Sequence, residues 1–328
     1  MNDRLLPVGV VGVGGLGYHH ARILRDVPGA RNVGVYDSDA GRLATVAAEL
    51  ELRAYGSLEE LLDETRAIVV AVPTTDHARV ALAAIERGVH VLIEKPIAAS
   101  LAEADEILAR AAEAGVMVAT GHVERFNGAV RACEPYVESP RFIESHRLAP
   151  FNPRGTDVAV VLDLMIHDID LVLGLAETGV AQVDAVGVPV LTPSVDIANA
   201  RLRFEGGAVA NITASRVSRE RMRKIRLFQP SGYLSLDLAN GTGEFLRLRE
   251  GVELGRLMGE GAFQLEHIIE RIELQGDGQE PLRAELESFV AAVRGESPLV
   301  VSGDAGRRAL AVALEIVERI ERDLPSPA

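Results

Sequence analysis

Apolar residues in the first third of the chain form short unbroken runs that alternate with amphipathic stretches. The strand-like runs are Val8–Val13, Asn32–Tyr36, Ala67–Val72, His90–Ile93 and Val116–Thr120. Helical spacing lies between them, from about Tyr18 to Asp26, over Asp76–Glu86 with Gly88 as its stop, and over Leu101–Glu113 with Gly115 as its stop. Apolar runs of this kind are typical of parallel strands covered on both faces. The alternation therefore predicts βαβ crossovers and a doubly wound parallel sheet.

The pattern changes after about residue 122. A long helical pattern covers Asp157–Leu175, and amphipathic helices over Leu282–Arg294 and Ala305–Arg322 finish the chain. Between them, extended segments are bounded by turn residues: Gln182–Leu191, Ile197–Phe204, Ala208–Ser215, Lys224–Gln229 and Tyr233–Asp237, with Glu205–Gly207 as a hairpin turn. We expect an open mixed or antiparallel sheet with helices on one face. The predicted domains are residues 1–122 and 123–328.

Composition narrows the class of protein. The chain has 328 residues and a formal net charge of −14, and so negative a surface repels nucleic acid and anionic membranes. Cys133 is the only cysteine, so neither an internal disulfide nor a cysteine-rich metal cluster can form. We see no signal-peptide pattern and no apolar run of membrane-spanning length. We therefore expect a cytoplasmic protein whose partner is a small molecule.

A glycine-rich loop follows the first strand. Gly12-Val13-Gly14-Gly15-Leu16-Gly17 matches G-x-G-x-x-G, lies between a strand and a helix, and precedes Asp37 at the end of the next strand. Such glycines permit a tight turn, close approach of a pyrophosphate and close helix–strand packing, while the acid binds the ribose hydroxyls. The pattern predicts a Rossmann domain that binds NAD, since Asp37 repels the extra phosphate of NADP. Arg42 is a basic residue that could tolerate that phosphate.

A lysine stands at the end of the strand His90–Ile93. The sequence there is Glu94-Lys95-Pro96, and ligands bind at the carboxyl ends of parallel strands. Glu94 is a partner for the lysine, and Pro96 fixes the backbone leaving the strand. The alternative is a solvated surface pair.

Acidic residues accompany a histidine on the predicted helix Asp157–Leu175. Asp163 and His167 are one turn apart on the same face, and Asp170 follows along that face. A carboxylate at this spacing can fix the imidazole tautomer and raise its basicity, which suits a general base at neutral pH. The alternatives are a structural histidine and a divalent metal site. We expect no metal, because no other close cluster of ligands appears.

Taken in this order, the glycine loop, Glu94-Lys95-Pro96 and the Asp163-x-x-x-His167 helix resemble the Gfo/Idh/MocA family of oxidoreductases, over essentially the whole chain. The resemblance implies a Rossmann domain followed by an open mixed sheet, with the active site in the cleft between them. It also implies that Lys95, Asp163 and His167 are catalytic. In that scheme His167 takes a hydroxyl proton while hydride passes to the nicotinamide, Lys95 steadies the hydroxyl and the nicotinamide ribose, and Asp163 orients the pair.

The expected cofactor contacts surround the glycine loop and the following strand ends. They are Gly12, Val13, Gly14, Leu16, Gly17, Asp37, Ser38, Arg42, Val72, Pro73, Thr74, His77, Glu94, Lys95 and Pro96.

The expected substrate is a sugar or a sugar derivative. The segment Gly121–Asn127 and a Pro-rich loop over His146–Gly155 supply Arg125, Asn127, Arg147 and Arg154, which join Asp170 as predicted substrate contacts. Arginines beside the cleft of so acidic a chain can clamp a phosphate or a carboxylate; the alternative is ordinary surface arginine.

The same segments, with Val188–Ser194 and Asn211–Arg216, are similar to the UDP-N-acetylglucosamine 3-dehydrogenase branch of the family. That resemblance implies oxidation of the 3-hydroxyl of a UDP-N-acetylhexosamine, whose keto product feeds an aminotransferase in lipid A synthesis. Gly15 departs from the pattern, because related loops commonly carry a larger residue there.

Two other functions stay open at this point. An inositol or free-sugar dehydrogenase would not need Arg147 and Arg154, and a non-catalytic sugar-nucleotide-binding regulator would not need the catalytic trio. We also expect a homodimer or homotetramer. Its interface would be the exposed face of the second sheet, because Ile197–Phe204 and Ala208–Ser215 alternate with many apolar residues.

Overall fold

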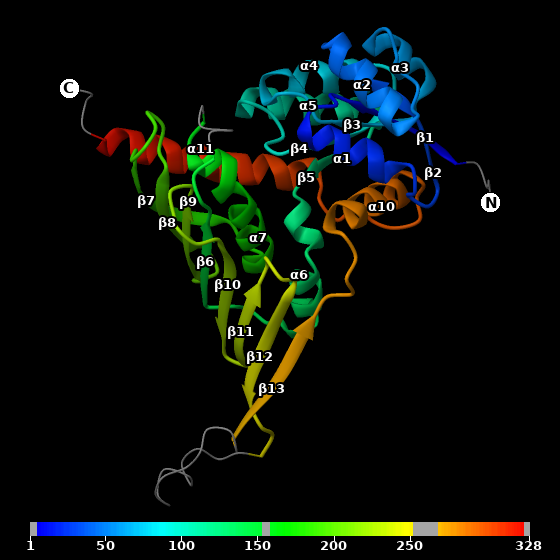
Figure 1. Ribbon diagram of the computed structural model, residues 1–328. Coiled ribbons are helices and arrows are strands. Elements are labelled where there is room, and N and C mark those ends of the chain that lie inside the picture. The colour runs from blue at the N-terminus through cyan, green and yellow to red at the C-terminus, as the bar shows by residue number, and fades with distance from the viewer. Residues whose placement is uncertain (1–4, 153–157, 252–267, 325–328) are drawn as a thin grey trace, which may run out of the picture. The chain divides into compact units, whose positions relative to one another are not determined.

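The computed structural model describes residues 5–152, 158–251 and 268–324. The chain forms two compact units, residues 1–126 with 280–311 and residues 127–279 with 312–328 (Figure 1). The sequence analysis placed a single boundary at residue 122. The structure differs mainly in returning residues 280–311 to the first unit.

The first unit is built on a five-stranded sheet in which all neighbouring strands run parallel, in the order β2-β1-β3-β4-β5. The strands are β1 (Leu6–Val11), β2 (Ala30–Tyr36), β3 (Ala67–Val70), β4 (His90–Glu94) and β5 (Val118–Gly121). Every residue of β3 is buried, as are all but the first of β4. The predicted doubly wound parallel sheet is confirmed.

Helices connect the strands of the first unit. They are α1 (Gly15–Leu24), α2 (Ala40–Leu50), α3 (Leu58–Glu64), α4 (Thr74–Ile85) and α5 (Leu101–Ala114), followed by the short 3-10 helix η1 (Val123–Phe126). Their ends follow local capping chemistry. The side chains of Ser57 and Ser100 accept backbone N–H bonds at the starts of α3 and α5, and Gly115 ends α5 in the left-handed conformation.

Helix α10 (Pro281–Val293) belongs to the first unit although it lies far along the chain. Its residues Leu286, Phe289 and Val290 share one buried cluster with residues of β1 and α1. Helical periodicity predicted this helix but not its place, because an amphipathic pattern shows that one face is buried and not what covers it.

The second unit is built on an eight-stranded mixed sheet in the order β13-β12-β11-β10-β6-β9-β8-β7. Its strands are β6 (Phe142–Leu148), β7 (Val180–Val188), β8 (Ile197–Phe204), β9 (Val209–Ser215), β10 (Met222–Gln229), β11 (Gly232–Asp237), β12 (Thr242–Leu248) and β13 (Ile269–Gln275). Only β6 and β9 pair in parallel among these neighbours. The predicted hairpin of β8 and β9 is confirmed, whereas β6, β12 and β13 were not predicted as strands.

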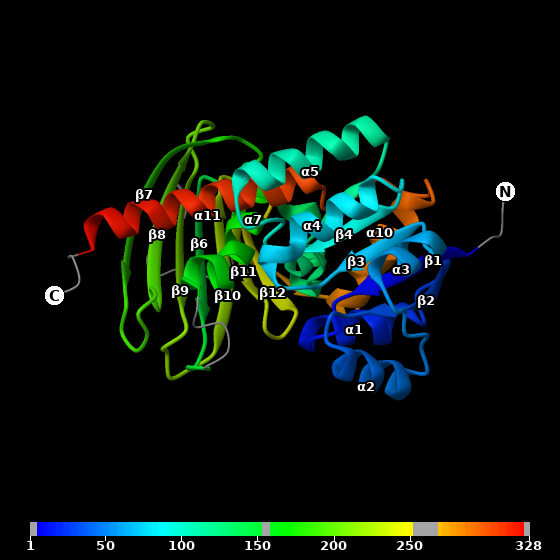
Figure 2. The same cartoon turned by 90° about the horizontal axis from the view of Figure 1, so that it is seen from above.

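Helices pack on one face of this sheet (Figures 1 and 2). Helix α6 (Gly128–Cys133) contacts β11, β12 and β13, and α7 (Ile166–Ala176) contacts β6 and β9. The last helix, α11 (Gly303–Asp323), is divided between the units after Ala311. In the described part of the chain, no helix is both long and apolar enough to cross a membrane.

The face of the second sheet that the helices leave uncovered carries polar side chains on β8 and β9. The apolar residues of β8 and β9, such as Ala200, Leu202 and Ile212, are buried, and the positions between them are polar: Asn199 donates to Thr213, and Arg201 donates to Asn211. These two strands therefore present a mainly polar outward face and supply little of the apolar area that an interface between copies needs. Aromatic residues instead occupy outward positions on β6, β10 and β11, where the Phe228 ring packs between those of Phe142 and Tyr233.

The predicted helix Asp157–Leu175 begins with an irregular turn. A π-helical segment, η3 (Val161–Met165), precedes α7, and Asp157 lies outside the described residues. A π turn holds more residues than an α turn, because its hydrogen bonds run from residue i to i+5. The regular one-turn spacing of Asp163 and His167 assumed from the sequence is therefore replaced by a wider turn.

Candidate functional site

Two glycines of the loop between β1 and α1 are required by close backbone contact. Gly12 has a φ of +85°, and a Cβ there would lie 2.7 Å from the backbone of Ala71. A Cβ on Gly17 would lie 1.8 Å from the carbonyl oxygen of Gly12. No side chain fits at either position without moving the backbone, so the turn and the packing of α1 on the sheet both depend on glycine.

Gly14 and Gly15, in contrast, face open space. No heavy atom lies within 4 Å of a Cβ built on either residue. Gly14 is the N-cap of α1 and no side chain caps this helix start, so its first amides can meet an anionic group directly. Because Gly15 has the same freedom, its departure from the larger residue of related loops leaves the turn intact.

Asp37 directly follows β2. Its carboxylate accepts the backbone N–H of Val13 at 2.7 Å through Oδ2 and that of Asp39 at 2.9 Å through Oδ1. A carboxylate oxygen can accept two hydrogen bonds, so each oxygen retains one acceptor position. Two adjacent hydroxyls, such as those of a ribose, match that capacity.

A pocket of about 430 Å³ opens at these residues. Seven of the predicted cofactor contacts line it: Gly12, Gly14, Asp37, Ser38, Arg42, Val72 and Pro73. The sequence analysis missed Asp76 and Arg79 of α4, which also line it and bind each other at 2.9 Å. Helical spacing predicted a helix over Asp76–Glu86, directly after this strand end, and that is the signal that could have identified them. A pocket with a glycine-rich floor and an acid at its rim fits the adenosine end of a dinucleotide.

The His77 side chain lies outside the lining of this pocket. It is 1 % exposed, and its ring nitrogens face the carbonyl oxygens of Pro96 at 2.9 Å and Val72 at 3.0 Å. Burial lowers the pKa of His77, although both carbonyls oppose that shift. His77 therefore links the segments that follow β3 and β4 through the carbonyl oxygens of Val72 and Pro96.

Lys95 follows β4 at the carboxyl edge of the sheet, where it was predicted. It is half-buried, and its peptide bond to Pro96 is cis. The Glu94 carboxylate does not extend toward solvent: Oε2 accepts the Lys95 backbone N–H at 3.2 Å, and Oε1 contacts His20 Nε2 at 2.6 Å. In these contacts Glu94 binds the backbone N–H of Lys95 and the imidazole ring of His20.

In the second unit, the predicted acid–histidine group lies where η3 passes into α7. Asp163 is in the π turn, His167 is in the first turn of α7, and both are half-buried. Asp168 and Asp170 are each 1 % exposed. Single π turns are frequent at functional sites, and the regular helical pattern of the sequence did not predict this one.

Arg147, which was expected to bind a phosphate, forms an ion pair with Asp168. It lies in β6 and not in a loop, is 3 % exposed, and donates to both oxygens of Asp168, at 2.7 and 3.2 Å. This bidentate ion pair joins β6 to α7 one residue from His167. The sequence revealed an arginine in an acidic chain but not the carboxylate opposite it.

The other predicted substrate contacts are divided between the units. Asn127 caps α6 by accepting the Ala129 N–H and donates to the Leu238 carbonyl oxygen, so its amide has a structural role. Arg125 is half-buried in η1 of the first unit. Arg154 lies outside the described residues.

Comparison with known proteins relates these observations to a family. Residues 6–122 match the model described as the oxidoreductase family with NAD-binding Rossmann fold, and residues 121–235 match that of the GFO/IDH/MocA C-terminal domain. A UDP-N-acetylglucosamine 3-dehydrogenase of Acidithiobacillus ferrooxidans is 39 % identical over 317 residues, covering 96 % of this chain and 97 % of that protein. A myo-inositol 2-dehydrogenase of Thermotoga maritima is 26 % identical over 335 residues, with 96 % of each covered.

A solved structure of the Acidithiobacillus ferrooxidans UDP-N-acetylglucosamine 3-dehydrogenase superimposes with a TM-score of 0.87 at 37 % identity, covering 97 % of this chain and 98 % of that one. The predicted fold class is confirmed by that likeness, and both family domains occur in the expected order. The chain therefore belongs to the Gfo/Idh/MocA family and is an oxidoreductase of the dehydrogenase type that uses a nicotinamide cofactor.

Proposed function

We propose that this chain is an NAD-dependent dehydrogenase that oxidises the 3-hydroxyl of UDP-N-acetylglucosamine or of a close UDP-N-acetylhexosamine. The observation that carries the proposal is 39 % identity to the Acidithiobacillus ferrooxidans enzyme over nearly the full length of both chains. The myo-inositol dehydrogenase matches over the same span at only 26 % identity, which favours the nucleotide sugar over a cyclitol.

The preference for NAD rests on Asp37. Its remaining acceptor positions suit two ribose hydroxyls, while a phosphate ester on the 2′ oxygen would bring negative charge against the carboxylate. Arg42 supports this assignment, because its Nε already donates to the Val13 carbonyl oxygen at 2.8 Å. The nearby Arg79 binds Asp76, so both arginines of the pocket have partners of their own.

The chemical roles follow from the residue types. The nicotinamide supplies the acceptor for the hydride that leaves the sugar carbon. His167 accepts the proton of the sugar hydroxyl, and Asp163 orients the imidazole and stabilises its charged form. The Lys95 ammonium group donates a hydrogen bond to the sugar oxygen and stabilises the negative charge that develops on that oxygen. Arg147, through Asp168, holds the start of α7 and acts as a positioning residue for His167.

Recognition of the diphosphate then requires cations other than Arg147. We assign this role to Arg125 and Arg154, while Asp170 stays a predicted acceptor for a sugar hydroxyl. The 3-keto product carries a carbonyl that can condense with an amine. An aminotransferase is therefore the class of enzyme that would consume it.

The test is a substrate comparison with purified protein and NAD. We expect NADH to form with UDP-N-acetylglucosamine, with a carbonyl-trapping reagent present to draw the reaction forward, and not with free N-acetylglucosamine or myo-inositol. NADH formation with myo-inositol alone would move the chain to the cyclitol dehydrogenases. Calorimetric binding of the nucleotide sugar without any NADH would instead identify a binding protein.

A further inference from the structure

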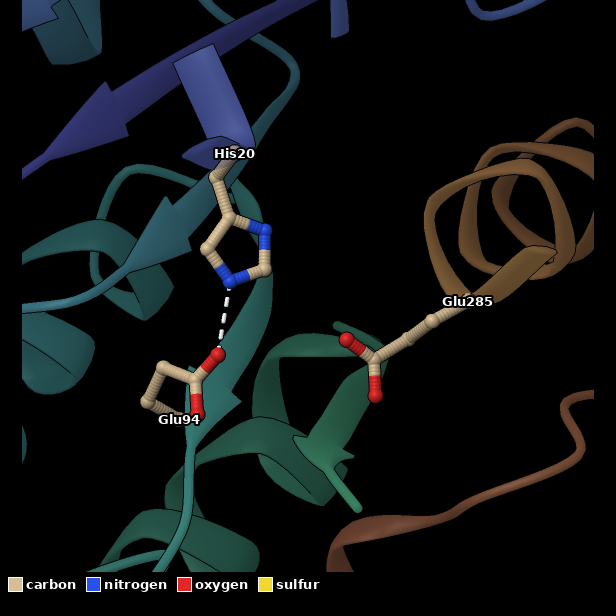
Figure 3. A group of neighbouring side chains, drawn as sticks. All are labelled: His20, Glu94 and Glu285. Atoms are coloured by element: carbon tan, nitrogen blue, oxygen red, sulfur yellow. Dashed lines mark hydrogen bonds and ion pairs between the residues drawn. The ribbon is translucent and has the colours of Figure 1, made fainter. Parts of the chain in front are cut away.

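Three titratable side chains meet in the interior of the first unit. His20 of α1, Glu94 of β4 and Glu285 of α10 are 0 %, 8 % and 2 % exposed, respectively. One nitrogen or oxygen atom from each lies within 4.8 Å of the others. Figure 3 shows the Glu285 carboxyl group pointing toward the hydrogen-bonded pair of His20 and Glu94. The sequence analysis did not foresee this group, because Glu285 comes from a helix far along the chain.

The carboxyl groups of Glu94 and Glu285 differ in their hydrogen-bond partners. Glu94 accepts the Lys95 backbone N–H at 3.2 Å, and in the tautomer that carries its proton on Nε2, His20 donates to Glu94 at 2.6 Å. Among the described residues, neither oxygen of Glu285 has a hydrogen-bond partner. Two buried carboxylates this close repel each other, and donors stabilise the charged form of only one of them. This arrangement favours the protonated form of Glu285.

Burial and a small cavity also favour a protonated Glu285. Burial raises the pKa of Glu285 well above its usual value, and the nearby charge of Glu94 raises it further. A cavity of about 10 Å³ borders Glu285, Ser288 and Thr120, about the size that one water needs. Among the described residues, the Thr120 hydroxyl has no hydrogen-bond partner, and it lines the same cavity as the Glu285 carboxyl group.

A metal ion fits the same three residues less well. Zinc ligands lie about 2.0–2.2 Å from the ion, so two of them in a tetrahedral site are roughly 3.3 Å apart. The 2.6 Å separation of His20 Nε2 and Glu94 Oε1 is a hydrogen-bond distance. At that separation the two groups share a hydrogen bond.

We propose that Glu285 is a positioning residue of the dehydrogenase: a neutral carboxylic acid packed against His20 and Glu94 that keeps Glu94 bound to the Lys95 backbone. Glu94 in turn fixes where the chain leaves β4, and thus where Lys95 begins. The inference rests on the proposed function in one respect, that Lys95 acts on the substrate. A leucine would fill this interior position without the desolvation of a carboxyl group, so the acid has a role beyond packing.

The test compares two variants of Glu285 with a matched control on the same helix. Glu285→Ala should lower kcat roughly ten- to a hundredfold, as loss of an orienting partner commonly does, with the Kd for NAD unchanged. Glu285→Gln, which is neutral and of similar shape, should restore most of that loss. The control is Glu287→Gln, which removes a half-exposed carboxylate paired with Arg283 at 2.8 Å and should leave kcat as in the wild type.

Infrared spectroscopy and metal analysis of the same proteins test the proton without any substrate. We expect the carbonyl band of a protonated carboxylic acid at neutral pH in the wild type and in Glu287→Gln, and its loss in Glu285→Gln. A Glu285→Gln variant that is folded but inactive would overturn the proposal, as would a stoichiometric metal ion that this variant loses. If Glu285→Ala does not fold, the Gln variant and its infrared band still decide the question.

The two proposals fail in different ways. If the wild type oxidises no nucleotide sugar, the proposed function fails while the infrared band still reports the protonated acid. If the wild type is active and Glu285→Ala retains full kcat, the positioning role alone is wrong.

Discussion

At the scale of single residues, the hydrogen-bond partners of a polar side chain show whether it can still bind a ligand or has a structural role. Asp37 keeps acceptor capacity beyond its two backbone donors. Arg147 and Asn127 are also polar, but their partners lie within the protein. Arg147 binds the Asp168 carboxylate, and Asn127 binds backbone groups at the start of α6 and just after β11. Sequence patterns identify residue types and not partners, so they assigned all three to ligands.

The first prediction concerns cofactor choice. Asp37→Ser should narrow the preference for NAD over NADP by roughly tenfold or more, since it removes a like-charge contact with the 2′-phosphate. Titration calorimetry of both cofactors against wild type and variant measures the change. Equal affinity of the wild type for the two cofactors would contradict the role given to Asp37.

The second prediction concerns the general base. His167→Ala should lower kcat by roughly two to four orders of magnitude, the usual contribution of a positioned base. The Kd for NAD should stay near that of the wild type, because the glycine loop and Asp37 belong to the other unit. His146→Ala, which removes a half-buried histidine of β6, is the control. Near-normal turnover of His167→Ala would show that another residue accepts the proton, and Lys95 would be the next residue to test.

At the scale of elements, the sequence predicted best where the signal is local. The glycine loop, the buried strands of the first unit and the turn between β8 and β9 all depend on neighbours in sequence. Strand β6 was missed because its inward position Arg147 is polar, and its burial depends on Asp168 of another element. The place of α10 and the π turn at Asp163 likewise depend on tertiary packing, which periodicity does not encode.

The segment between β7 and β8 supplies a prediction at this scale. Burial would raise the pKa of Asp196, but the backbone N–H groups of Leu191, Thr192 and Val190 and the Thr192 hydroxyl outweigh it and hold the pKa at about 2. A lowered pKa means that the ionised form stabilises the fold. This contribution is complete above the unfolded pKa, near 3.8, and is lost as pH falls toward 2.

Asp196→Asn should therefore reduce the free energy of unfolding at pH 7 by about 2 kcal/mol. The difference from wild type should shrink between pH 4 and pH 3, as measured by urea unfolding at each pH. A difference that stays constant with pH would show that charge on Asp196 is not the cause.

At the scale of the whole molecule, the outward face of the second sheet leads us to expect self-association. Phe142, Phe228 and Tyr233 stack across β6, β10 and β11 on that face. Apolar area left exposed on a sheet is commonly covered by a second copy. Light scattering at micromolar concentration should give a multiple of 35.1 kDa, and Phe228→Asp should reduce it. A monomeric wild type would rule this interface out.

The central claim is that hydride leaves carbon 3 of a nucleotide sugar for the nicotinamide. The most direct measurement uses UDP-N-acetylglucosamine with deuterium at carbon 3, NAD and the wild-type protein, followed by mass spectrometry of the reduced cofactor. We predict deuterium in the NADH and a slower reaction than with unlabelled sugar. NADH free of deuterium, formed at an undiminished rate, would contradict the account.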